Sequence, residues 1–408
     1  MPKHNLIQNI IALVFVQFAN YISPLLVLPY LSRVLGLDGF GTIAMAMSLC
    51  SIALVITDYG FALSAPYWIS KNKLDKSAVS SYLGAIFFIK TILFIICGSL
   101  FFIYLTVNDS ISKYGFIKYY IVASIFFQSF QPNWFFLGIE KMKNVTIFMV
   151  TAKMTYLIMV FWLVKKSTQV DLVILCFAIS NLLATLIGFF YLYKEKYWIS
   201  IPTPTLVWRV AKDSSPFFIS RLAVGVYTSA STFLVGNFAG TSAAALYGSA
   251  EKLYQAGQSI SSPVSQALFP YLARTGDNRA LYKFVGILFV PITFGVILSI
   301  NYSDLIMEVF FGKDFGAASG LLNIFLVTLL VNFIGVNFGY PAFASIGRVD
   351  IANKSVLFAA AFQMLLLVGM FLSNSIDAKN ICLSVLFVES VVMLVRVYYF
   401  FYLSKRVC

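Results

Sequence analysis

The stretch SSPFFISRLAVGVYTSASTFLVGNF, residues 214–238, together with Asp213 just before it, decides the fold class of this chain. It is long enough to cross a bilayer, which takes about 20 mainly apolar residues in a helix. Well inside it lies Arg221, although an arginine at the centre of a membrane helix costs roughly 2.5–3.5 kcal/mol. At about 100° per residue, one narrow face of the helix carries Arg221 together with Ser214, Gly225, Thr228 and Thr232. This polar stripe therefore faces a protein interior or a wet cavity and not lipid.

Two interpretations of Arg221 stay open at this point. In the first, the arginine belongs to an anion site in a transport pathway. In the second, it is a structural residue that pairs with a carboxylate or extends toward the lipid headgroups. Other predicted spans repeat the pattern of a polar stripe with a charge, which favours the first interpretation.

The composition predicts an all-α integral membrane protein. The chain has 408 residues, of which 60% are hydrophobic and 11% charged, whereas about a quarter of a soluble domain is charged. Apolar runs of spanning length recur from end to end and predict about 12 transmembrane helices. They lie near residues 7–30, 41–63, 79–105, 115–137, 144–164, 170–193, 213–238, 243–270, 284–303, 318–341, 354–374 and 380–403. There is no room for a separate soluble domain.

The longest predicted cytoplasmic connection, residues 194–212, divides the chain into two halves of six helices each. The prediction is an N-terminal lobe over residues 1–193 and a C-terminal lobe over residues 213–408, around a central cleft. A weak match between the halves, in which Gly36 falls on Gly240, indicates a parallel internal repeat.

Basic residues concentrate in alternate connections between the spans, and the positive-inside rule then places both termini in the cytoplasm. The net charge of +13 is explained by this bias and by a cationic cavity, without nucleic acid. The predicted spans contain five basic residues, Lys90, Lys153, Arg221, Lys252 and Arg396, and three acidic ones, Asp58, Glu251 and Glu389. This surplus of cations suits an anion and not a cation as the transported species.

A second polar stripe follows the span at 243–270 and consists of Glu251, Gln255, Gln258, Ser262 and Gln266. Lys252 cannot face Glu251, because adjacent residues diverge on a helix. Arg221 is the natural partner of Glu251, either in a transport site or in a purely structural ion pair. Glu389 and Arg396 share one face two turns apart and do not pair directly. Arg396 is expected to reach toward the cytoplasmic interface.

Three charged residues in the first half each have two interpretations. Asp58, near the end of the second span, is either a cap or pairing residue, or a gate or ion ligand. Lys90 and Lys153 lie inside their spans, where a lone lysine could extend to the interface but two together favour a cavity.

No cofactor or metal is expected. The five cysteines are distant from one another in sequence, which argues against a disulfide framework and a zinc site. His4 is the only histidine, so histidine catalysis is excluded. The glycines of GLDGFG, residues 36–41, lie in a short turn between spans and do not form a nucleotide site.

Five motifs carry a resemblance to a known family. PYLSRVLGLDGFG at 29–41 and DYGFALS at 58–64 resemble the first two spans of polysaccharide transporters in the multidrug/oligosaccharidyl-lipid/polysaccharide exporter superfamily. NWFFLGIEKMK at 133–143 is the most specific match. LYGSAEKL within 235–253 and FFGKDFGAA within 309–318 fit the second half. The chain most resembles O-antigen flippases of the Wzx type.

The resemblance implies a non-enzymatic transporter of the bacterial inner membrane. Such proteins move undecaprenyl-diphosphate-linked oligosaccharide units from the cytoplasmic to the periplasmic leaflet by alternating access between two six-helix lobes. The cationic cavity of this family would here consist of Arg221, Lys90, Lys153 and Lys252, with Glu251, Glu389 and Asp58 as coupling or pairing acids. The expected partners are the lipid-linked oligosaccharide, membrane lipids and other polysaccharide-assembly membrane proteins.

Three other functions compete with this expectation. A drug exporter of the same superfamily would need an acid-rich cavity for cationic drugs. A membrane component of the glycan polymerase or ligase machinery would need a long periplasmic connection and clustered catalytic groups, and the sequence has neither. A scaffold of the glycan-assembly complex would give no reason for basic residues inside spans.

Overall fold

The computed structural model describes the backbone of residues 3–407, and their side chains except in 3–25, 109–110, 220, 223–224, 226–229, 260–264, 266–267, 270 and 405–407. Within this range every regular element is a helix, which confirms the all-α prediction. Eight helical segments of the described residues are long and apolar enough to span a membrane, so this is a multi-pass membrane protein. The predicted number of about twelve spans stays a prediction.

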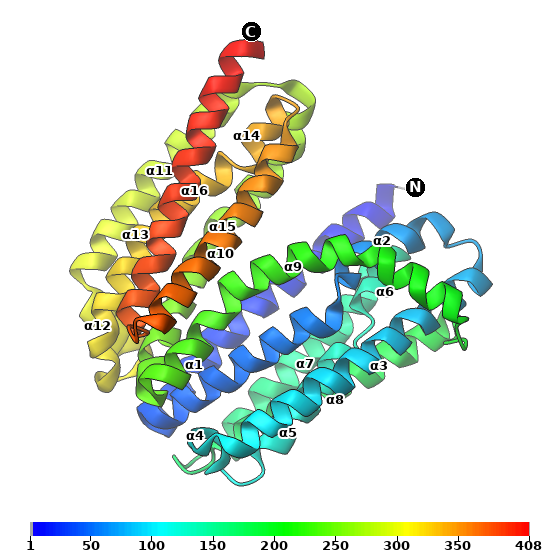
Figure 1. The fold of residues 1–408 in the computed structure, drawn as a ribbon, viewed down its shortest axis with the longest axis horizontal. Coiled ribbons are helices and arrows are strands. Elements are labelled where there is room, and N and C mark those ends of the chain that lie inside the picture. The colour runs from blue at the N-terminus through cyan, green and yellow to red at the C-terminus, as the bar shows by residue number, and fades with distance from the viewer. Residues whose placement is uncertain (1–2, 408) are drawn as a thin grey trace. The chain divides into compact units, whose positions relative to one another are not determined.

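The chain forms two compact units, Met1–Gly225 and Val226–Cys408. The division falls inside one helix, α9 (Pro204–Ala239). The predicted lobes at 1–193 and 213–408 therefore stay a prediction about the chain's organisation. The other helices of the N-terminal unit are α1 (Lys3–Asp58), α2 (Phe61–Asn72), α3 (Lys76–Val107), α4 (Asp109–Ser112), α5 (Ile117–Ser129), α6 (Asn133–Gly138), α7 (Met142–Leu163) and α8 (Val170–Lys194) (Figure 1).

The C-terminal unit continues with seven α-helices and one short 3₁₀ helix in the described residues. They are α10 (Thr241–Thr275), α11 (Asn278–Asn301), α12 (Ser303–Phe311), η1 (Lys313–Ala318), α13 (Ser319–Asn337), α14 (Tyr340–Ser345), α15 (Val349–Leu372) and α16 (Ala378–Val407). Most long helices begin and end within several residues of the predicted spans, because the apolar runs set their length.

Two backbone breaks divide the first part of the chain. Gly36 interrupts α1 with φ 66° and ψ −173°, a conformation that favours glycine, and so separates the predicted spans at 7–30 and 41–63. Tyr59 and Gly60, with φ of 48° and 78°, end α1 before residue 63. Asp58 then accepts a hydrogen bond from the Ala62 backbone N–H at 3.2 Å, which caps the start of α2.

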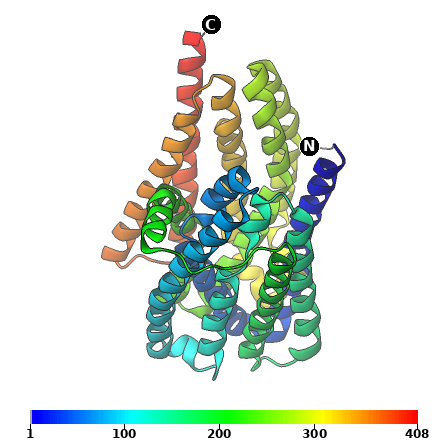
Figure 2. The same cartoon turned by 90° about the vertical axis from the view of Figure 1, so that its right-hand side faces the viewer.

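The two units repeat one packing scheme. In the N-terminal unit α5 packs on α3 and α8, and α7 packs on α8; these helices lie side by side in both views (Figures 1 and 2). In the C-terminal unit α13 packs on α11 and α16, and α15 packs on α16. Likewise α6 packs on α2, and α14 packs on α10. The same pairs of helices are therefore in contact in both units.

The turns after α6 and α14 have the same geometry. Glu140 and Gly347 both have positive φ, 63° and 68°. The following Lys141 N–H donates to Phe136 O at 2.9 Å, and Arg348 N–H donates to Phe343 O at 2.8 Å. Gly240, the predicted counterpart of Gly36, is also extended with positive φ, at 97° and 166°. The two units thus share these turns, and the duplication of a six-helix half stays a prediction.

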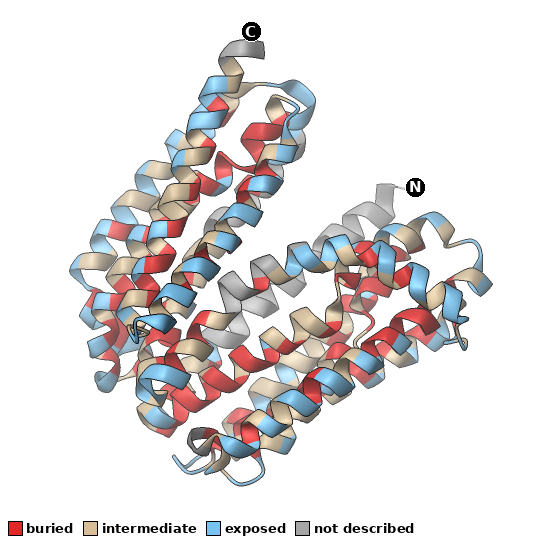
Figure 3. Ribbon diagram, viewed as in Figure 1, coloured by how far each residue is buried: buried red, intermediate tan, exposed pale blue. Residues whose placement is uncertain are grey.

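Aromatic side chains form much of the core in each unit. Phe135, Phe136 and Phe148 are fully buried in the N-terminal unit, and Phe343 and Phe400 in the C-terminal unit. Exposed residues recur along the long helices of both units (Figure 3), and many of them are large and apolar, such as Leu100, Ile158 and Leu365. This distribution is that of a protein whose outer surface is solvated by lipid tails.

The connection between α8 and α9 is held against the start of α3. The Tyr197 hydroxyl donates to Lys73 O at 3.1 Å, and the Ser200 N–H donates to Ser80 O at 3.3 Å. Burial, followed by the nearby Glu195 charge, raises the pKa of the Tyr197 hydroxyl. A Cβ added to Gly84 would lie 1.7 Å from Ser200 O, so glycine is required for this close approach.

Candidate functional site

A polar pocket of about 430 Å³ lies within the N-terminal unit. Its walls come from the end of α1 and from α2, α3, α5, α6, α7, α8 and the first part of α9. Four of the charged residues that the sequence singles out line it together: Asp58, Lys90, Lys153 and Arg221. These are the charged residues of its lining in the described part of the chain, so the pocket carries a surplus of positive charge.

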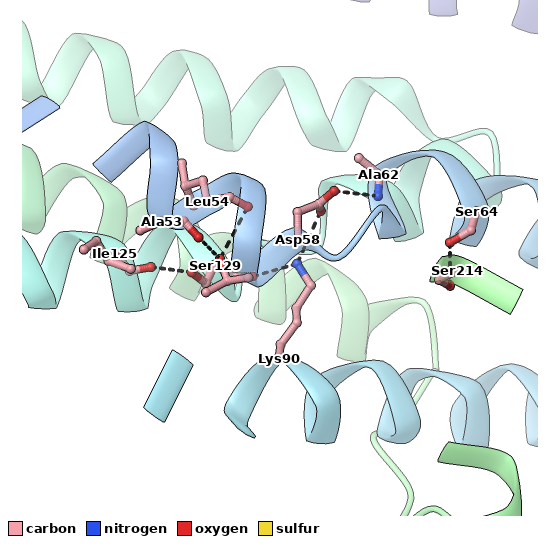
Figure 4. Close-up of polar contacts among 10 residues, drawn as sticks. Ala53, Leu54, Asp58, Ala62, Ser64, Lys90, Ile125, Ser129 and Ser214 are labelled. Carbon is pink, nitrogen blue, oxygen red and sulfur yellow. Dashed lines mark hydrogen bonds and ion pairs between the residues drawn. The ribbon is translucent and has the colours of Figure 1, made fainter. Parts of the chain in front are cut away.

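Lys90 and Asp58 form an ion pair in this pocket. Lys90 projects from α3, and its Nζ lies 3.6 Å from Asp58 Oδ1 (Figure 4). The Lys90 side chain is 3% exposed and the Asp58 side chain 20%. Lys90 Nζ also donates to Ser129 O at 2.9 Å. Asp58 thus caps α2 and pairs with Lys90 at the same time, while its role as a gate or ion ligand stays a prediction.

The surroundings of the Lys90 ammonium group fix its position. The Phe61 and Trp134 ring centroids lie 5.9 and 6.0 Å from Nζ, within the range of cation–π attraction. Ser129 is held by its own hydroxyl, which donates to Ile125 O at 2.6 Å and lies 2.8 Å from the Thr57 hydroxyl oxygen. A buried charge is tolerated in a protein when it is paired and hydrogen-bonded in this way.

Arg221 and Lys153 supply the other positive charges. Arg221, in α9, is exposed and Lys153, in α7, is half-buried. On the face of α9 that carries Arg221, the Ser214 hydroxyl oxygen lies 2.9 Å from that of Ser64. Gly225 on the same face lies against Val55. The polar stripe therefore contacts protein at both positions, as its periodicity predicts; the Thr228 side chain is outside the described residues.

A set of neutral polar side chains completes the pocket, and sequence reasoning did not identify it. Gln131 Nε2 donates to Asn181 Oδ1 at 3.0 Å. Gln128 Nε2, Asn133 Oδ1 and Trp134 Nε1 are buried and have no hydrogen-bond partner among the described residues. The signal in the sequence is QSFQPNW at 128–134, where three amides surround a proline inside an apolar run.

The remaining predicted site residues belong to the C-terminal unit. The Glu251 carboxylate accepts a hydrogen bond from the Thr232 hydroxyl at 2.7 Å. Lys252 is exposed, and its ammonium group donates to Gln255 Oε1 at 3.0 Å. Glu389 is half-buried on α16. Because Arg221 and Glu251 belong to different units, their pairing stays a prediction; the side chains of Ser262 and Gln266 are outside the described residues.

Arg396 has a structural environment. It is 8% exposed. Its guanidinium group donates to Ser355 Oγ and to Gly335 O, both at 2.8 Å, and so joins α16 to α15 and α13. A Cβ on Gly339 would lie 3.0 Å from the same group. These bonds give Arg396 a structural role, and the expectation that it reaches toward the cytoplasmic interface stays a prediction.

The described residues contain no group of three or more His, Cys, Asp and Glu side chains arranged to hold a metal ion. Cys50, Cys97, Cys176 and Cys382 are buried free thiols, and Cys408 is outside the described residues.

Comparisons with solved structures agree with the fold. An inward-facing transporter of the multidrug resistance MATE family, in the MOP superfamily, has a TM-score of 0.72 at 13% identity, covering 98% of both chains. The lipid II flippase MurJ, in an inward closed conformation, has a TM-score of 0.70 at 14% identity, covering 96% of this chain and 87% of that one. At such identities the likeness concerns the fold alone.

Comparisons of sequence are more specific. A protein of Shigella dysenteriae described as "Putative O-antigen transporter" is 26% identical over 402 residues, which cover 95% of this chain and 98% of the relative. A protein of Escherichia coli (strain K12) with the same description is 28% identical over 279 residues, covering 67% of this chain and 66% of the relative. Residues 6–276 match the family described as polysaccharide biosynthesis protein. This match extends over more than half of the sequence, and the chain belongs to that family.

Proposed function

We propose that this protein is a flippase for undecaprenyl-diphosphate-linked repeat units of O-antigen or a related surface polysaccharide. It moves them from the cytoplasmic to the periplasmic leaflet of the bacterial inner membrane by alternating access. The observation that carries this proposal is the positively charged polar pocket inside an apolar helical unit, lined by Lys90, Lys153 and Arg221. The relatives described as O-antigen transporters support the same function.

The physical need for such a pocket follows from the substrate. A diphosphate cannot cross hydrocarbon unassisted, because burial of an unpaired ion costs tens of kcal/mol. Fixed guanidinium and ammonium groups replace its water with charge-assisted hydrogen bonds. The lipid tail stays in the bilayer while the headgroup passes through the protein. An anion that moves outward also gains roughly 2.3 kcal/mol per charge per 100 mV of membrane potential.

The basic residues have different parts in this proposal. Arg221 is the principal phosphate ligand, since a guanidinium group can bind a phosphate in a bidentate manner. Lys153 adds charge from α7, and Lys252, which belongs to the C-terminal unit, is a further candidate phosphate ligand. Lys90 is already engaged by Asp58 and Ser129, so it contributes a fixed positive potential. Glu251, Glu389 and Asp58 are candidate acids for coupling to proton entry or for pairing.

A drug exporter remains the second candidate, because MATE-family transporters share the fold. The pocket argues against it, since cationic drugs need acidic ligands and three basic residues face one carboxylate here. For a component of the polymerase or ligase machinery, no observation of this structure gives specific support.

Deletion of the gene tests the proposal. The expected result is loss of surface polysaccharide together with accumulation of a lipid-linked sugar unit on the cytoplasmic side, and both are restored by the wild-type chain. Accumulation on the periplasmic side would instead indicate a polymerase or ligase step. Normal polysaccharide display with increased sensitivity to cationic drugs would favour the exporter.

A further inference from the structure

The neutral side of the pocket has buried polar atoms for which the described residues provide no hydrogen-bond partner. Gln128 Nε2 lies in the last turn of α5, and Asn133 Oδ1 and Trp134 Nε1 lie in the first turn of α6. We name these three side chains the neutral wall. Trp134 is only 2% exposed. A buried polar group without a partner costs about 1–3 kcal/mol, and such groups are rare in native proteins. Three of the nine such side-chain atoms in the described residues line this one pocket, where a ligand can reach them.

The chemistry of the three atoms restricts the kind of ligand. The indole N–H of Trp134 and the amide nitrogen of Gln128 donate hydrogen bonds, whereas the Asn133 carbonyl oxygen accepts them. A phosphate oxygen accepts only and leaves Asn133 unsatisfied. An ammonium group donates only and leaves the other two unsatisfied. A hydroxyl group donates and accepts, so a polyhydroxylated ligand satisfies all three.

The size and charge of the site agree with such a ligand. The pocket volume of about 430 Å³ is many times the roughly 30 Å³ that one water occupies in the liquid. Next to the neutral wall, the Lys90 charge is compensated by Asp58 at 3.6 Å. Lys153 and Arg221 come from other elements, α7 and α9. Charged and neutral contacts therefore come from different helices of the same pocket.

We propose that the neutral wall binds hydroxyl groups of the sugar attached to the diphosphate and thereby determines which repeat units are accepted. This inference rests on the proposed function, and it assigns specificity to Gln128, Asn133 and Trp134. The basic residues hold the diphosphate that all such substrates share. The neutral wall contacts the sugar, which differs from one substrate to another.

Binding to the purified full chain in lipid nanodiscs tests this. The probes are undecaprenyl diphosphate without sugar and a panel of undecaprenyl diphosphates that each carry one hexose or N-acetylhexosamine. At least one sugar-bearing probe is expected to bind more tightly than the bare lipid. Trp134→Phe removes one donor and keeps the ring, and Gln128→Met keeps the length. Each should reduce this preference about three- to tenfold while the affinity for the bare lipid stays unchanged.

Trp162→Phe is the matched control, because Trp162 lies on α7 and is 76% exposed. It should leave both affinities unchanged. The melting temperature of each ligand-free variant shows whether it is folded; if Trp134→Phe does not fold, Gln128→Met decides the outcome.

Two results overturn the inference in distinguishable ways. If every sugar-bearing probe binds no more tightly than the bare lipid, or if the variants weaken both equally, water occupies the wall and the sugar is read elsewhere. Diphosphate binding that depends on Arg221 would then still support the flippase. If neither probe binds to the wild-type chain, the proposed function fails and the inference fails with it.

Discussion

At the scale of single residues, the N-terminal pocket separates two uses of a buried positive charge. Lys90 is buried, paired with Asp58 and bonded to a backbone carbonyl. Arg221 is exposed and lines the same pocket. A buried ammonium group depends on its carboxylate partner, because loss of that partner leaves an uncompensated charge, whereas an accessible guanidinium group is available to a mobile anion. The two should therefore respond differently to substitution.

The Lys90–Asp58 pair is predicted to support stability. Asp58→Asn keeps an acceptor for the Ala62 N–H but leaves the Lys90 charge without its carboxylate. Removal of one partner of a buried pair costs about 3–5 kcal/mol, so the melting temperature should fall. The double variant Asp58→Asn with Lys90→Met should recover most of the lost melting temperature, because it no longer contains the unpaired charge.

The matched control is the Lys73–Glu140 pair, at 3.3 Å and with side chains 39% and 35% exposed. Glu140→Gln should cost less than about 1 kcal/mol, because exposed pairs contribute little. An equal loss in both single variants would contradict the distinction between the two pairs.

Arg221 is predicted to act on transport and not on stability. Arg221→Ala should abolish most polysaccharide display at normal membrane abundance. Arg221→Lys should keep part of it, since an ammonium group still attracts phosphate but cannot bind it in a bidentate manner. Display and abundance are measured in cells that lack the chromosomal gene.

The double variant Arg221→Ala with Glu251→Ala separates the two explanations of Arg221. If the arginine only balances the Glu251 charge, display and abundance should both recover in the double variant. Lost display at normal abundance in both variants is the result that a substrate ligand requires.

At the scale of elements, the close contact between α3 and the connection before α9 is the feature most sensitive to one atom. Gly84→Ala places a Cβ where Ser200 O now lies. Overpacking of this kind costs typically about 1–3 kcal/mol. We expect a lower melting temperature and faster proteolysis within residues 195–203.

Gly98→Ala in the same helix is the control, because the nearest atom to its Cβ would be at 3.4 Å. Alanine is also the better helix former by about 1 kcal/mol, so this variant should be neutral or stabilising. Equal destabilisation by both substitutions would contradict the prediction that the Ser200 contact makes Gly84 more sensitive than Gly98.

The same scale shows what the sequence can and cannot predict. Apolar runs predict the long helices, because spanning length and hydropathy depend on local sequence alone. The charges inside those runs predict that Lys90, Lys153 and Arg221 belong to a site. The sequence does not predict that Asp58 forms an ion pair with Lys90, since the two residues are brought together by the packing of α1 against α3. The predicted span at 41–63 continues through the break at Tyr59–Gly60. The neutral wall was not predicted either, because isolated amides near a proline resemble an ordinary loop.

At the scale of the whole molecule, the two units share one packing scheme but not one chemistry. The N-terminal unit encloses the polar pocket. The C-terminal unit has an apolar cavity of about 490 Å³ between α10, α11, α12 and α13, lined by residues such as Leu288, Ile292 and Leu326. The cavities of the two units therefore differ in polarity, although the turns after α6 and α14 have the same geometry.

Membrane orientation is predicted from the charges of the connections. Both termini and the connections at 71–76 and 194–212 should be cytoplasmic. Cysteine introduced by Ser167→Cys or Ser375→Cys should then react with an impermeant thiol reagent added outside spheroplasts. The four described native cysteines are buried, so their background labelling should be low. Protection of both introduced thiols until permeabilisation would reverse the orientation.

The neutral wall occupies one short piece of chain, residues 128–134, from the last turn of α5 across Pro132 into α6. Contacts to a ligand are usually scattered over distant segments, which makes them difficult to exchange. Here a heptapeptide bounded by two helices could be transplanted as a cassette between related chains without alteration of the lysines and arginines. Substrate preference in such chimaeras should then follow the donor of the cassette, and glycan export could be reprogrammed by exchange of seven codons.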